Sequence, residues 1–273
     1  MSALITLTTD FGLSDSYVGT MKGVILTILP SARIVDITHG IAPHNIAQAA
    51  FVLATAAPYF RHGTTHVAVV DPGVGGERRP IAVFTETATY VGPDNGLFSR
   101  IYQTEKVKQI RLLSNASYHL PGLSRTFHGR DLFAPAAAHI AQGAPPSSLG
   151  PELSDPVVIA VEQAERLDDG SLRGHVTYVD HFGNLITDIP VPWLENRSDW
   201  TFVIGGNVTA GFLTTYSHVA PGEIVVLGGS SGWVEVAVRH GSAADSLRLG
   251  EGAIVQAWPN VQTFERANVQ TFK

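Results

Sequence analysis

One short segment combines a carboxylate and two arginines at the end of an apolar run. VVDPGVGGERRP, residues 69–80, reaches Asp71, and a loop with three glycines then leads to Arg78 and Arg79. Glycine and proline let such a loop fold back on itself. A carboxylate beside a guanidinium can orient a water molecule or accept its proton. The same segment also suits an exposed turn with a surface ion pair, so further residues must decide.

Other polar residues stand at comparable places. Asp10 follows the run ALITLTT, as Asp71 follows THVAVV, and ligands of α/β sheets bind beyond such strand ends. Asp15 comes five residues after Asp10, where it could bind a ligand or cap the next helix. His128 lies in TFHGRDLF, just before another expected helix. The two strand-end aspartates predict a site at this edge, and His128 is a candidate third member.

The second half of the chain offers two weaker patterns. YVDHFGNLITD places Asp180, Phe182 and Asn184 around a glycine turn. LGGSSGWVE places Ser230 and Ser231 in a glycine-rich loop, whose backbone N–H groups could bind a carboxylate. Either pattern alone is also typical of an ordinary connector.

The elements that position these residues differ between the two halves. Up to about residue 150, β-rich runs alternate with helical patterns, which predicts βαβ units around a largely parallel sheet. The expected strands are ALITLTTD, RIVDIT, THVAVVD, PIAVFTE and ATYVG, and the expected helices are SYVGTMKGVILTILP, residues 45–57 and DLFAPAAAHIAQG.

A segment rich in proline, glycine and serine, residues 143–156, predicts a linker. Beyond it, short runs such as VVIAVEQAERL, LRGHVTYVD, EIVVLGG and WVEVAVRH predict a small all-β barrel or sandwich. We therefore expect an α/β domain over 1–150, an all-β domain over 157–259 and a C-terminal extension over 260–273. The extension holds NVQTF twice, at 260–264 and 268–272.

Composition narrows the classes of function. The 273 residues are 44% hydrophobic and 15% charged, which indicates a compact globular chain. A net charge of -6 without a basic run argues against nucleic-acid binding. The absence of cysteine excludes disulfides and thiolate chemistry. The start of the chain resembles no signal peptide and the longest apolar run is too short to span a bilayer, so we expect a cytoplasmic protein without membrane segments.

Taken together, the motifs resemble one family. TTDFGLSDSYVGTMKGVI, VVDPGVGGERR, VGPDNGLF, FHGRDLFAPAAAH, YVDHFGNLITD and GGSSGWVEVAV are similar in order and spacing to the S-adenosylmethionine hydroxide adenosyltransferases, relatives of the fluorinating and chlorinating enzymes. The resemblance runs from residue 4 to about 257. It implies conversion of S-adenosylmethionine and water to adenosine, methionine and a proton, with no cofactor and no metal.

The resemblance also implies roles for residues. Asp71, Arg78 and His128 match the trio around the attacking water, with Arg78 favoured over Arg79 by the family spacing. The sequence leaves open which of the trio accepts the water's proton. The implied substrate-binding residues are Asp10 for the ribose, Asp15 and Asp180 for the methionine ammonium, Phe182, Asn184 and Tyr216 for adenine, Ser230 and Ser231 for the carboxylate, and Glu235.

Two positions depart from the family pattern. His44 follows Pro43 where an aromatic residue is frequent, which weakens the expectation of adenine stacking from that side. Ser231 stands where a halogenating relative has arginine.

The nearest alternative function is that of a chlorinase-like halogenase. Among the halogenating relatives, fluorinase has tyrosine and serine at the positions of His128 and Gly129, and it lacks the Asp and Arg pair of the water site.

Two alternatives belong to other classes. A metallohydrolase could use Asp10, Asp71, His128 and His139 as ligands, although no HxxxH or DxH pattern supports it. A noncatalytic protein that binds adenosine or S-adenosylmethionine is the other.

The resemblance finally implies a homotrimer in which the α/β domain of one subunit meets the β domain of the next, with the small-molecule substrate bound at their interfaces.

Overall fold

The structure is a computed structural model that describes residues 2–160, 163–194 and 199–259. The chain divides into two compact units, Met1–Val161 and Glu162–Lys273, called here the α/β unit and the β unit. The repeated NVQTF segments lie outside the described residues.

The α/β unit is built on a six-stranded sheet in the order β2-β1-β3-β5-β4-β6. Pairing is parallel from β2 to β5 and antiparallel for β5 with β4 and for β4 with β6, so the predicted largely parallel sheet is confirmed. The strands are β1 Leu4–Thr9, β2 Arg33–Thr38, β3 Thr64–Val69, β4 Pro80–Thr85, β5 Ala88–Pro93 and β6 Val107–Leu112.

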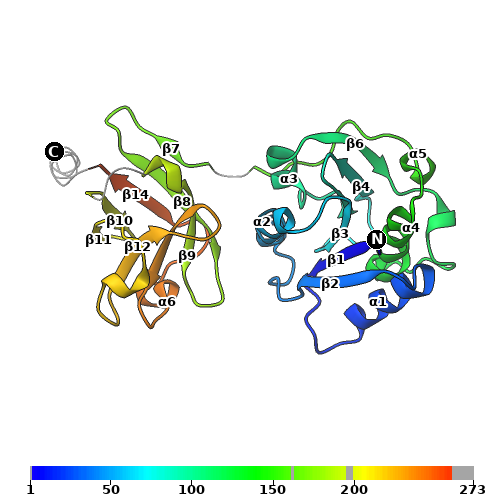
Figure 1. Ribbon diagram of the computed structural model, residues 1–273, viewed down its shortest axis with the longest axis horizontal. Coiled ribbons are helices and arrows are strands. Elements are labelled where there is room, and N and C mark those ends of the chain that lie inside the picture. Colours follow the sequence, from blue (N-terminus) through cyan, green and yellow to red (C-terminus); the bar gives the residue numbers. More distant parts are fainter. Residues whose placement is uncertain (1, 161–162, 195–198, 260–273) are drawn as a thin grey trace. The chain divides into compact units, whose positions relative to one another are not determined.

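Helices cover both faces of this sheet (Figure 1). Helices α1 and α4 pack together on one face, around a core that includes Met21, Val67 and Phe133, and α2 and α3 cover the other around Leu53 and Tyr90. The helices are α1 Tyr17–Ile28, α2 Ile46–Ala56, α3 Ser99–Thr104, α4 Ala134–Gln142 and α5 Pro146–Leu149, with short helical turns η1 Ala57–Tyr59 and η2 Ala116–Tyr118. A π-helical turn, η3 Gly129–Phe133, precedes α4, where the sequence predicts one α-helix from Asp131.

The register of the central strands brings the two strand-end aspartates together. β1 and β3 are parallel neighbours, and Thr9 pairs with Val69. Asp10 directly follows Thr9, and Asp71 comes two residues after Val69. Both therefore leave the sheet at the same edge, as the strand pattern predicts.

The predicted linker packs on the α/β unit. Within residues 143–156, α5 buries Leu149, and Leu153 also joins the core of this unit. The run that follows was expected to be a strand, but only β7, Glu165–Arg166, is one among its described residues. The backbone N–H of Val157 donates instead to Asp94, which lies after β5. The backbone N–H of Ile159 likewise donates to Ser99 Oγ, so the backbone of this run binds side chains of the first unit rather than a neighbouring strand.

The β unit is an antiparallel, nearly closed, barrel-like sheet in the order β11-β10-β14-β8-β9-β13-β12, with β7 paired to β8. This confirms the expected barrel-like domain (Figure 1). Alternating residues of its strands fill one core, which includes Val176, Phe202 and Val236. The strands are β8 Leu172–Val179, β9 Leu185–Pro190, β10 Thr201–Ile204, β11 Asn207–Ala210, β12 Ile224–Gly228, β13 Trp233–Val238 and β14 Ile254–Trp258, with α6 Ala243–Leu247, η4 Val191–Trp193 and η5 Tyr216–His218.

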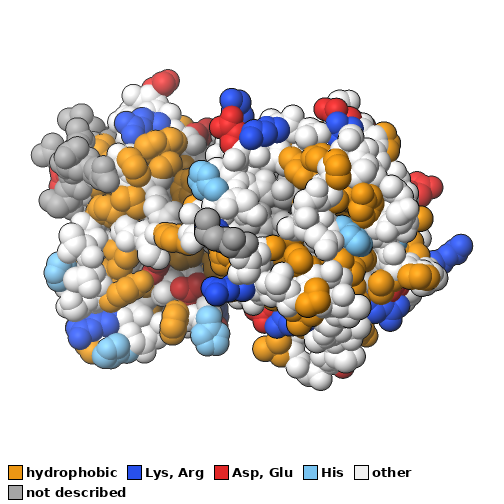
Figure 2. All heavy atoms as spheres, turned by 45° about the vertical axis from the view of Figure 1, so that its right-hand side comes forward, with side chains coloured by type: hydrophobic (Ala, Val, Ile, Leu, Met, Phe, Trp, Pro, Cys, Tyr) orange, Lys and Arg blue, Asp and Glu red, His pale blue; other side chains and the backbone are white. Residues whose placement is uncertain are grey.

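The surface agrees with the low content of charged residues. The face drawn in Figure 2 carries hydrophobic and uncharged side chains between scattered charged ones, without a large basic region. Within the described part of the chain, no helix is long and apolar enough to cross a membrane.

A buried histidine predicts a pH dependence of folding. His66 on β3 is 1% exposed, stacks on Tyr90 and hydrogen-bonds Thr6 Oγ1 through Nδ1 at 2.7 Å. Burial lowers the pKa of His66 from 6.5 to about 4, although the charge of Glu105 opposes this. The unfolded chain thus binds a proton at a higher pH than the folded one, and stability is lost as the pH falls from 6.5 towards 4.

We therefore expect the free energy of unfolding of the wild type to fall, between pH 7 and pH 5, by about 2 kcal/mol more than that of His66→Gln. Urea titrations of both proteins at several pH values measure this. Parallel pH curves for the two proteins would show that His66 is charged in the folded state or exerts no such effect.

Candidate functional site

The loop after β3 folds back so that Arg78 binds Asp71. Arg78 Nε lies 2.9 Å from both carboxylate oxygens, and Nη2 lies 2.5 Å from Oδ2. The side chains are only 10% and 5% exposed. Gly75 makes the fold-back possible, because its φ is +74° and a Cβ there would lie 2.1 Å from the carbonyl oxygen of Arg125. The glycines thus explain how two residues seven positions apart form a direct ion pair.

His128 completes the trio. Its Nδ1 lies 2.5 Å from Arg78 Nη2, and because a guanidinium only donates, Nδ1 accepts and the ring proton sits on Nε2. Burial, followed by the positive charge of Arg78, lowers the pKa of His128, while Asp71 and Asp131 act in the opposite direction. The ring is therefore neutral at pH 7, and the three side chains form one hydrogen-bonded chain.

The neighbouring arginine serves another purpose. Arg79 Nε donates to Asp94 Oδ2 at 2.8 Å, and Nη1 donates to Asp155 Oδ1 at 2.9 Å. These contacts hold residues 155–157 against the end of β5. Of the two arginines in the loop, Arg78 is the one that contacts Asp71 and His128.

A cavity of about 300 Å³ opens beside the trio. Asp71 and His128 line it together with Asp10, whose Oδ2 accepts the backbone N–H of His44 at 2.9 Å. His44 itself has a φ of +69°, a conformation that is costly for a residue with a side chain. The full lining is Asp10, Phe11, Tyr17, Pro43, His44, Val69, Asp71, Val74, Thr126, Phe127, His128 and Gly129. The three residues most expected to meet at this sheet edge thus share one cavity.

An aromatic wall of this cavity escaped sequence reasoning. Phe11, Tyr17 and Phe127 contact one another, with ring centroids 5.1 to 5.9 Å apart and mostly edge-to-face geometry. In the sequence, Phe11 directly follows the candidate residue Asp10, and Phe127 directly precedes the candidate residue His128. That adjacency was the available signal, but an aromatic residue beside a polar one is as common in cores.

Asp15 does not join the group around the cavity. It is exposed in the loop before α1, and it is not among the lining residues. It also does not cap α1, because the N-cap residue is Ser16 and no side-chain capping bond forms. Neither of the two roles considered for Asp15 is thus visible within the α/β unit.

In the β unit, the turn between β8 and β9 holds three candidates. Asp180 Oδ1 accepts the backbone N–H groups of Phe182 and Asn184, and Oδ2 accepts Asn184 Nδ2 at 2.9 Å. Gly183 allows the tight turn, because its φ is +80° and a Cβ would lie 2.1 Å from Ser242 Oγ. The turn presents the Phe182 ring, 74% exposed, as a flat apolar surface.

A second polar pair lies on neighbouring elements. Tyr216 donates its hydroxyl to Glu235 Oε1 at 2.5 Å. Burial raises the pKa of Glu235, helped by the charge of Asp180 and opposed by the bond from Tyr216. Ser230 and Ser231 are exposed in the turn between β12 and β13.

A shallow cavity of about 590 Å³ gathers part of this set. Its lining includes three predicted residues, and Arg239 and His240, which sequence reasoning missed. The full lining is Phe182, Asn184, Thr215, Tyr216, Ser217, Val238, Arg239, His240 and Gly241. The candidate residues are thus divided between a polar trio with a cavity in one unit and an aromatic, amide-bearing cavity in the other.

The ligand set of the metallohydrolase alternative does not assemble. Among the residues that the structure describes, no three His, Asp or Glu side chains are grouped so as to hold a metal ion. His139 instead packs its ring against Tyr118, with centroids 5.2 Å apart.

Comparisons with known proteins identify the family of this chain. Residues 5–150 match the SAM hydroxide adenosyltransferase N-terminal domain, and residues 174–256 match the C-terminal domain of the same family. The chain belongs to the SAM hydroxide adenosyltransferase family. The trio, both cavities and the division into two units therefore lie within the family's two domains.

Individual relatives agree with this membership. The (R)-S-adenosyl-L-methionine hydrolase of Thermus thermophilus is 41% identical over 254 residues, which cover 90% of this chain and 96% of the relative. A fluorinase of Nocardia brasiliensis is 25% identical, covering 94% and 92%. The crystal structure of an uncharacterized conserved protein from Thermotoga maritima superposes with a TM-score of 0.87 at 34% identity, covering 93% of this chain and 99% of that one.

Proposed function

We propose that the protein hydrolyses S-adenosyl-L-methionine to adenosine and L-methionine, by in-line attack of water at C5′ of the ribose. The observation that carries this proposal is the Asp71–Arg78–His128 chain at a cavity that also holds Asp10. Similarity to an (R)-S-adenosyl-L-methionine hydrolase over 90% of the chain supports the choice of substrate.

The trio suits a reaction that is limited by its nucleophile. The sulfonium of the substrate is a good leaving group, so no acid is needed to expel methionine. Water, by contrast, has a pKa of roughly 15.7 and is a weak nucleophile at pH 7. The Arg78 charge stabilises negative charge developing on that water, and the cavity holds the oxygen in line with C5′. No cofactor and no metal enter the proposed step.

Asp71 is the group best able to accept the proton. A carboxylate offers about four lone-pair sites, and Arg78 makes three contacts with this one. His128, by comparison, already spends its Nδ1 lone pair on Arg78. We therefore assign proton acceptance to Asp71 and orientation of Arg78 to His128.

The other candidates are assigned to the substrate. Asp10 is proposed to bind the ribose hydroxyls beside the attacked carbon, since it shares the cavity with the trio. Phe182 and Tyr216 are proposed to pack on adenine, and Asn184 to hydrogen-bond its edge. The remaining proposed contacts, to the methionine group, are Asp15, Asp180, Ser230, Ser231 and Glu235.

Gly129 argues against the halide site of fluorinase. At this position, where fluorinase resembles this chain in its surrounding motif but has serine, a Cβ would lie 3.2 Å from each of Met21 Sδ, Phe11 Cε2 and Phe127 Cε2. A serine side chain would crowd these three groups. The halide-binding hydroxyl of fluorinase therefore has no ready place here.

The product of the reaction separates a hydrolase from a halogenase. We expect chromatography of S-adenosylmethionine incubated with the protein to show adenosine and methionine in equal amounts, with or without high chloride. A solvent-oxygen label should appear in the adenosine 5′-hydroxyl, because the water oxygen becomes that group. Mainly 5′-chloro-5′-deoxyadenosine in chloride would identify a halogenase, and unchanged substrate after prolonged incubation would identify a binding protein.

We also propose a homotrimer in which the α/β unit of one subunit and the β unit of the next form each site. Support comes from the distribution of the candidates, since water activation and adenine binding reside on different units. In such a ring, inactive variants can complement each other.

Asp71→Ala alters only the α/β half of a site, and Asn184→Ala only the β half. Mixed at random in equal amounts, the two variants should restore roughly a quarter of the sites. A site is intact only when its α/β half comes from the Asn184→Ala variant and its β half comes from the Asp71→Ala variant. Co-refolding followed by an assay of adenosine release measures the recovery. No recovery in trimers shown by mass to be mixed would place each site within one chain.

A further inference from the structure

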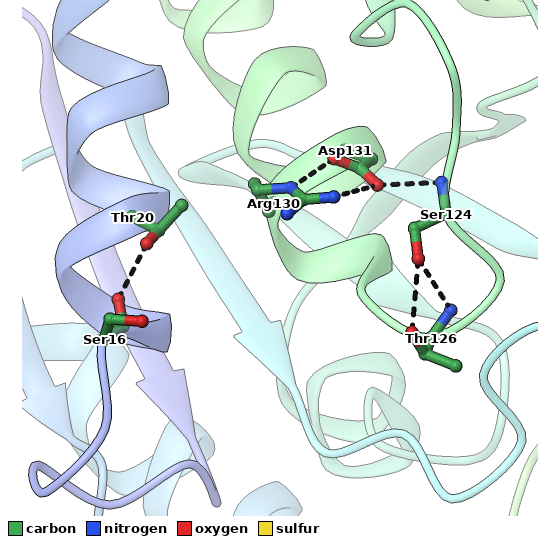
Figure 3. A network of polar contacts seen from close by, with 6 residues as sticks. All are labelled: Ser16, Thr20, Ser124, Thr126, Arg130 and Asp131. Atoms are coloured by element: carbon green, nitrogen blue, oxygen red, sulfur yellow. Dashed lines mark hydrogen bonds and ion pairs between the residues drawn. The ribbon is translucent and has the colours of Figure 1, made fainter.

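A buried carboxylate outside the trio holds the loop that carries His128. Asp131 lies in the π-helical turn with its side chain 3% exposed, and its Oδ2 accepts the backbone N–H of Ser124 at 2.8 Å. Arg130 forms an ion pair with the same carboxylate. Figure 3 shows Asp131 between Arg130 on one side and Ser124 on the other. The Asp131 side chain thus fixes the peptide at Ser124.

The loop held in this way leads directly to His128. The backbone N–H of Asp131 also donates to the carbonyl oxygen of Phe127, the residue before His128, at 3.1 Å. The backbone of Ser124 acts on the His128 ring as an acceptor, which raises the pKa of His128. A ring N–H that donates to a carbonyl oxygen has this effect, because the bond favours the protonated ring. Since Nδ1 accepts from Arg78, the ring proton is on Nε2. The loop is stiffened further by Ser124 Oγ, which accepts the backbone N–H of Thr126.

We propose that Asp131 is a positioning residue of the reaction, which holds residues 124–127 so that the His128 ring keeps its Nδ1 turned to Arg78. This inference rests on the proposed hydrolysis for its kinetic consequences but not for its structural ones. Because Nδ1 accepts from Arg78, His128 orients Arg78 and cannot take a proton there without breaking that bond. Asp131 thus acts on the loop before His128, and His128 acts through Arg78 on Asp71.

Asp94 provides a matched control within the same unit. Its side chain is 1% exposed, it pairs with Arg79, and its Oδ1 accepts the backbone N–H of Val157 at 2.8 Å. It therefore resembles Asp131 in burial and in partners, but it is connected to residues 155–157 rather than to His128. Asp94→Ala and Asp131→Ala should both lower the melting temperature.

The kinetic test separates positioning from stability. Asp131→Ala should lower kcat roughly tenfold to a hundredfold, as expected for loss of a hydrogen bond to a charged group, with KM little changed. Asp94→Ala should keep kcat near the wild-type value. Asp131→Asn should recover most of kcat despite its lost ion pair, because the amide oxygen still accepts the Ser124 N–H. An equal loss of kcat in Asp94→Ala, or no recovery in Asp131→Asn, would overturn the proposal.

A spectroscopic test needs no turnover. In protein with ¹⁵N-labelled histidine, assigned through His128→Gln, the neutral His128 ring should show a protonated Nε2 and an unprotonated Nδ1. Asp131→Ala should shift these signals towards a mixture of tautomers. A wild-type ring protonated on Nδ1, or unchanged signals in a folded Asp131→Ala, would refute the proposal even if the substrate proved to be different. If Asp131→Ala does not fold, Asp131→Asn takes its place: its amide oxygen keeps the bond to Ser124, so its His128 signals should match the wild type, and shifted signals would overturn the proposal.

Discussion

Arg78→Lys is expected to lower kcat by roughly 10²–10³, the range seen when one preorganised donor to a developing anion is removed. Arg78 uses Nε and Nη2 on Asp71 and the same Nη2 on His128, a planar arrangement that a single ammonium cannot reproduce. The loss should fall on kcat rather than on KM, because Arg78 supports charge that forms only in the transition state. Steady-state kinetics of adenosine release measure both constants.

Arg79→Lys is the natural control, because it changes the adjacent residue in the same way. The hydrogen bonds of the Arg79 side chain go to Asp94 and Asp155, which lie outside the trio. We therefore expect Arg79→Lys to lose a little stability and to keep a nearly normal kcat. Equal kinetic losses in the two variants would mean that the loop, and not the Arg78 guanidinium, governs the rate.

Asp71→Asn is expected to have a loss of similar or greater size, a decrease in kcat of roughly 10²–10⁴. The amide can keep a hydrogen bond with Arg78, but it cannot accept a proton from water and leaves the guanidinium charge unbalanced. Removal of the Asp71 charge also removes one of the influences that raise the pKa of His128, so this pKa should fall further. Single-turnover kinetics, together with calorimetric binding of S-adenosylmethionine, separate the chemical step from affinity.

The comparison for this variant is Asp94→Asn, which neutralises another buried carboxylate paired with an arginine. We expect it to bind and hydrolyse the substrate almost normally while it unfolds more readily. Wild-type kcat in Asp71→Asn would reassign proton acceptance to bulk solvent or to another group.

Much of the site could be predicted because its residues are tied to local patterns. Asp10 and Asp71 are recognisable as strand-end residues from the β-rich runs before them, and neighbouring parallel strands bring such ends together. The pairing of Asp71 with Arg78 follows from a glycine-rich loop of fixed length. The family resemblance, carried by motifs along almost the whole chain, supplied the roles of His128 and of the residues of the β unit.

The boundaries and the packing of loops were less accessible. Residues 143–156 have the composition of a linker, yet they bury Leu149 and Leu153 in the α/β unit. The apolar run after residue 156 has the composition of a strand, yet the N–H of Val157 is taken by Asp94. Composition records which residues a segment contains, whereas these outcomes depend on which partners lie within reach.

What the sequence by itself determined was the order of elements, the α/β and all-β halves, and the polar residues that end strands or occupy glycine turns. These follow from the two-residue and 3.6-residue periods and from backbone freedom, which act over a few neighbouring positions. Only the tertiary structure decided that Phe11, Tyr17 and Phe127 form one wall and that Asp131 binds Ser124 in the loop before His128. Such contacts arise where separate segments meet, and short-range patterns carry no record of the distances and directions between segments.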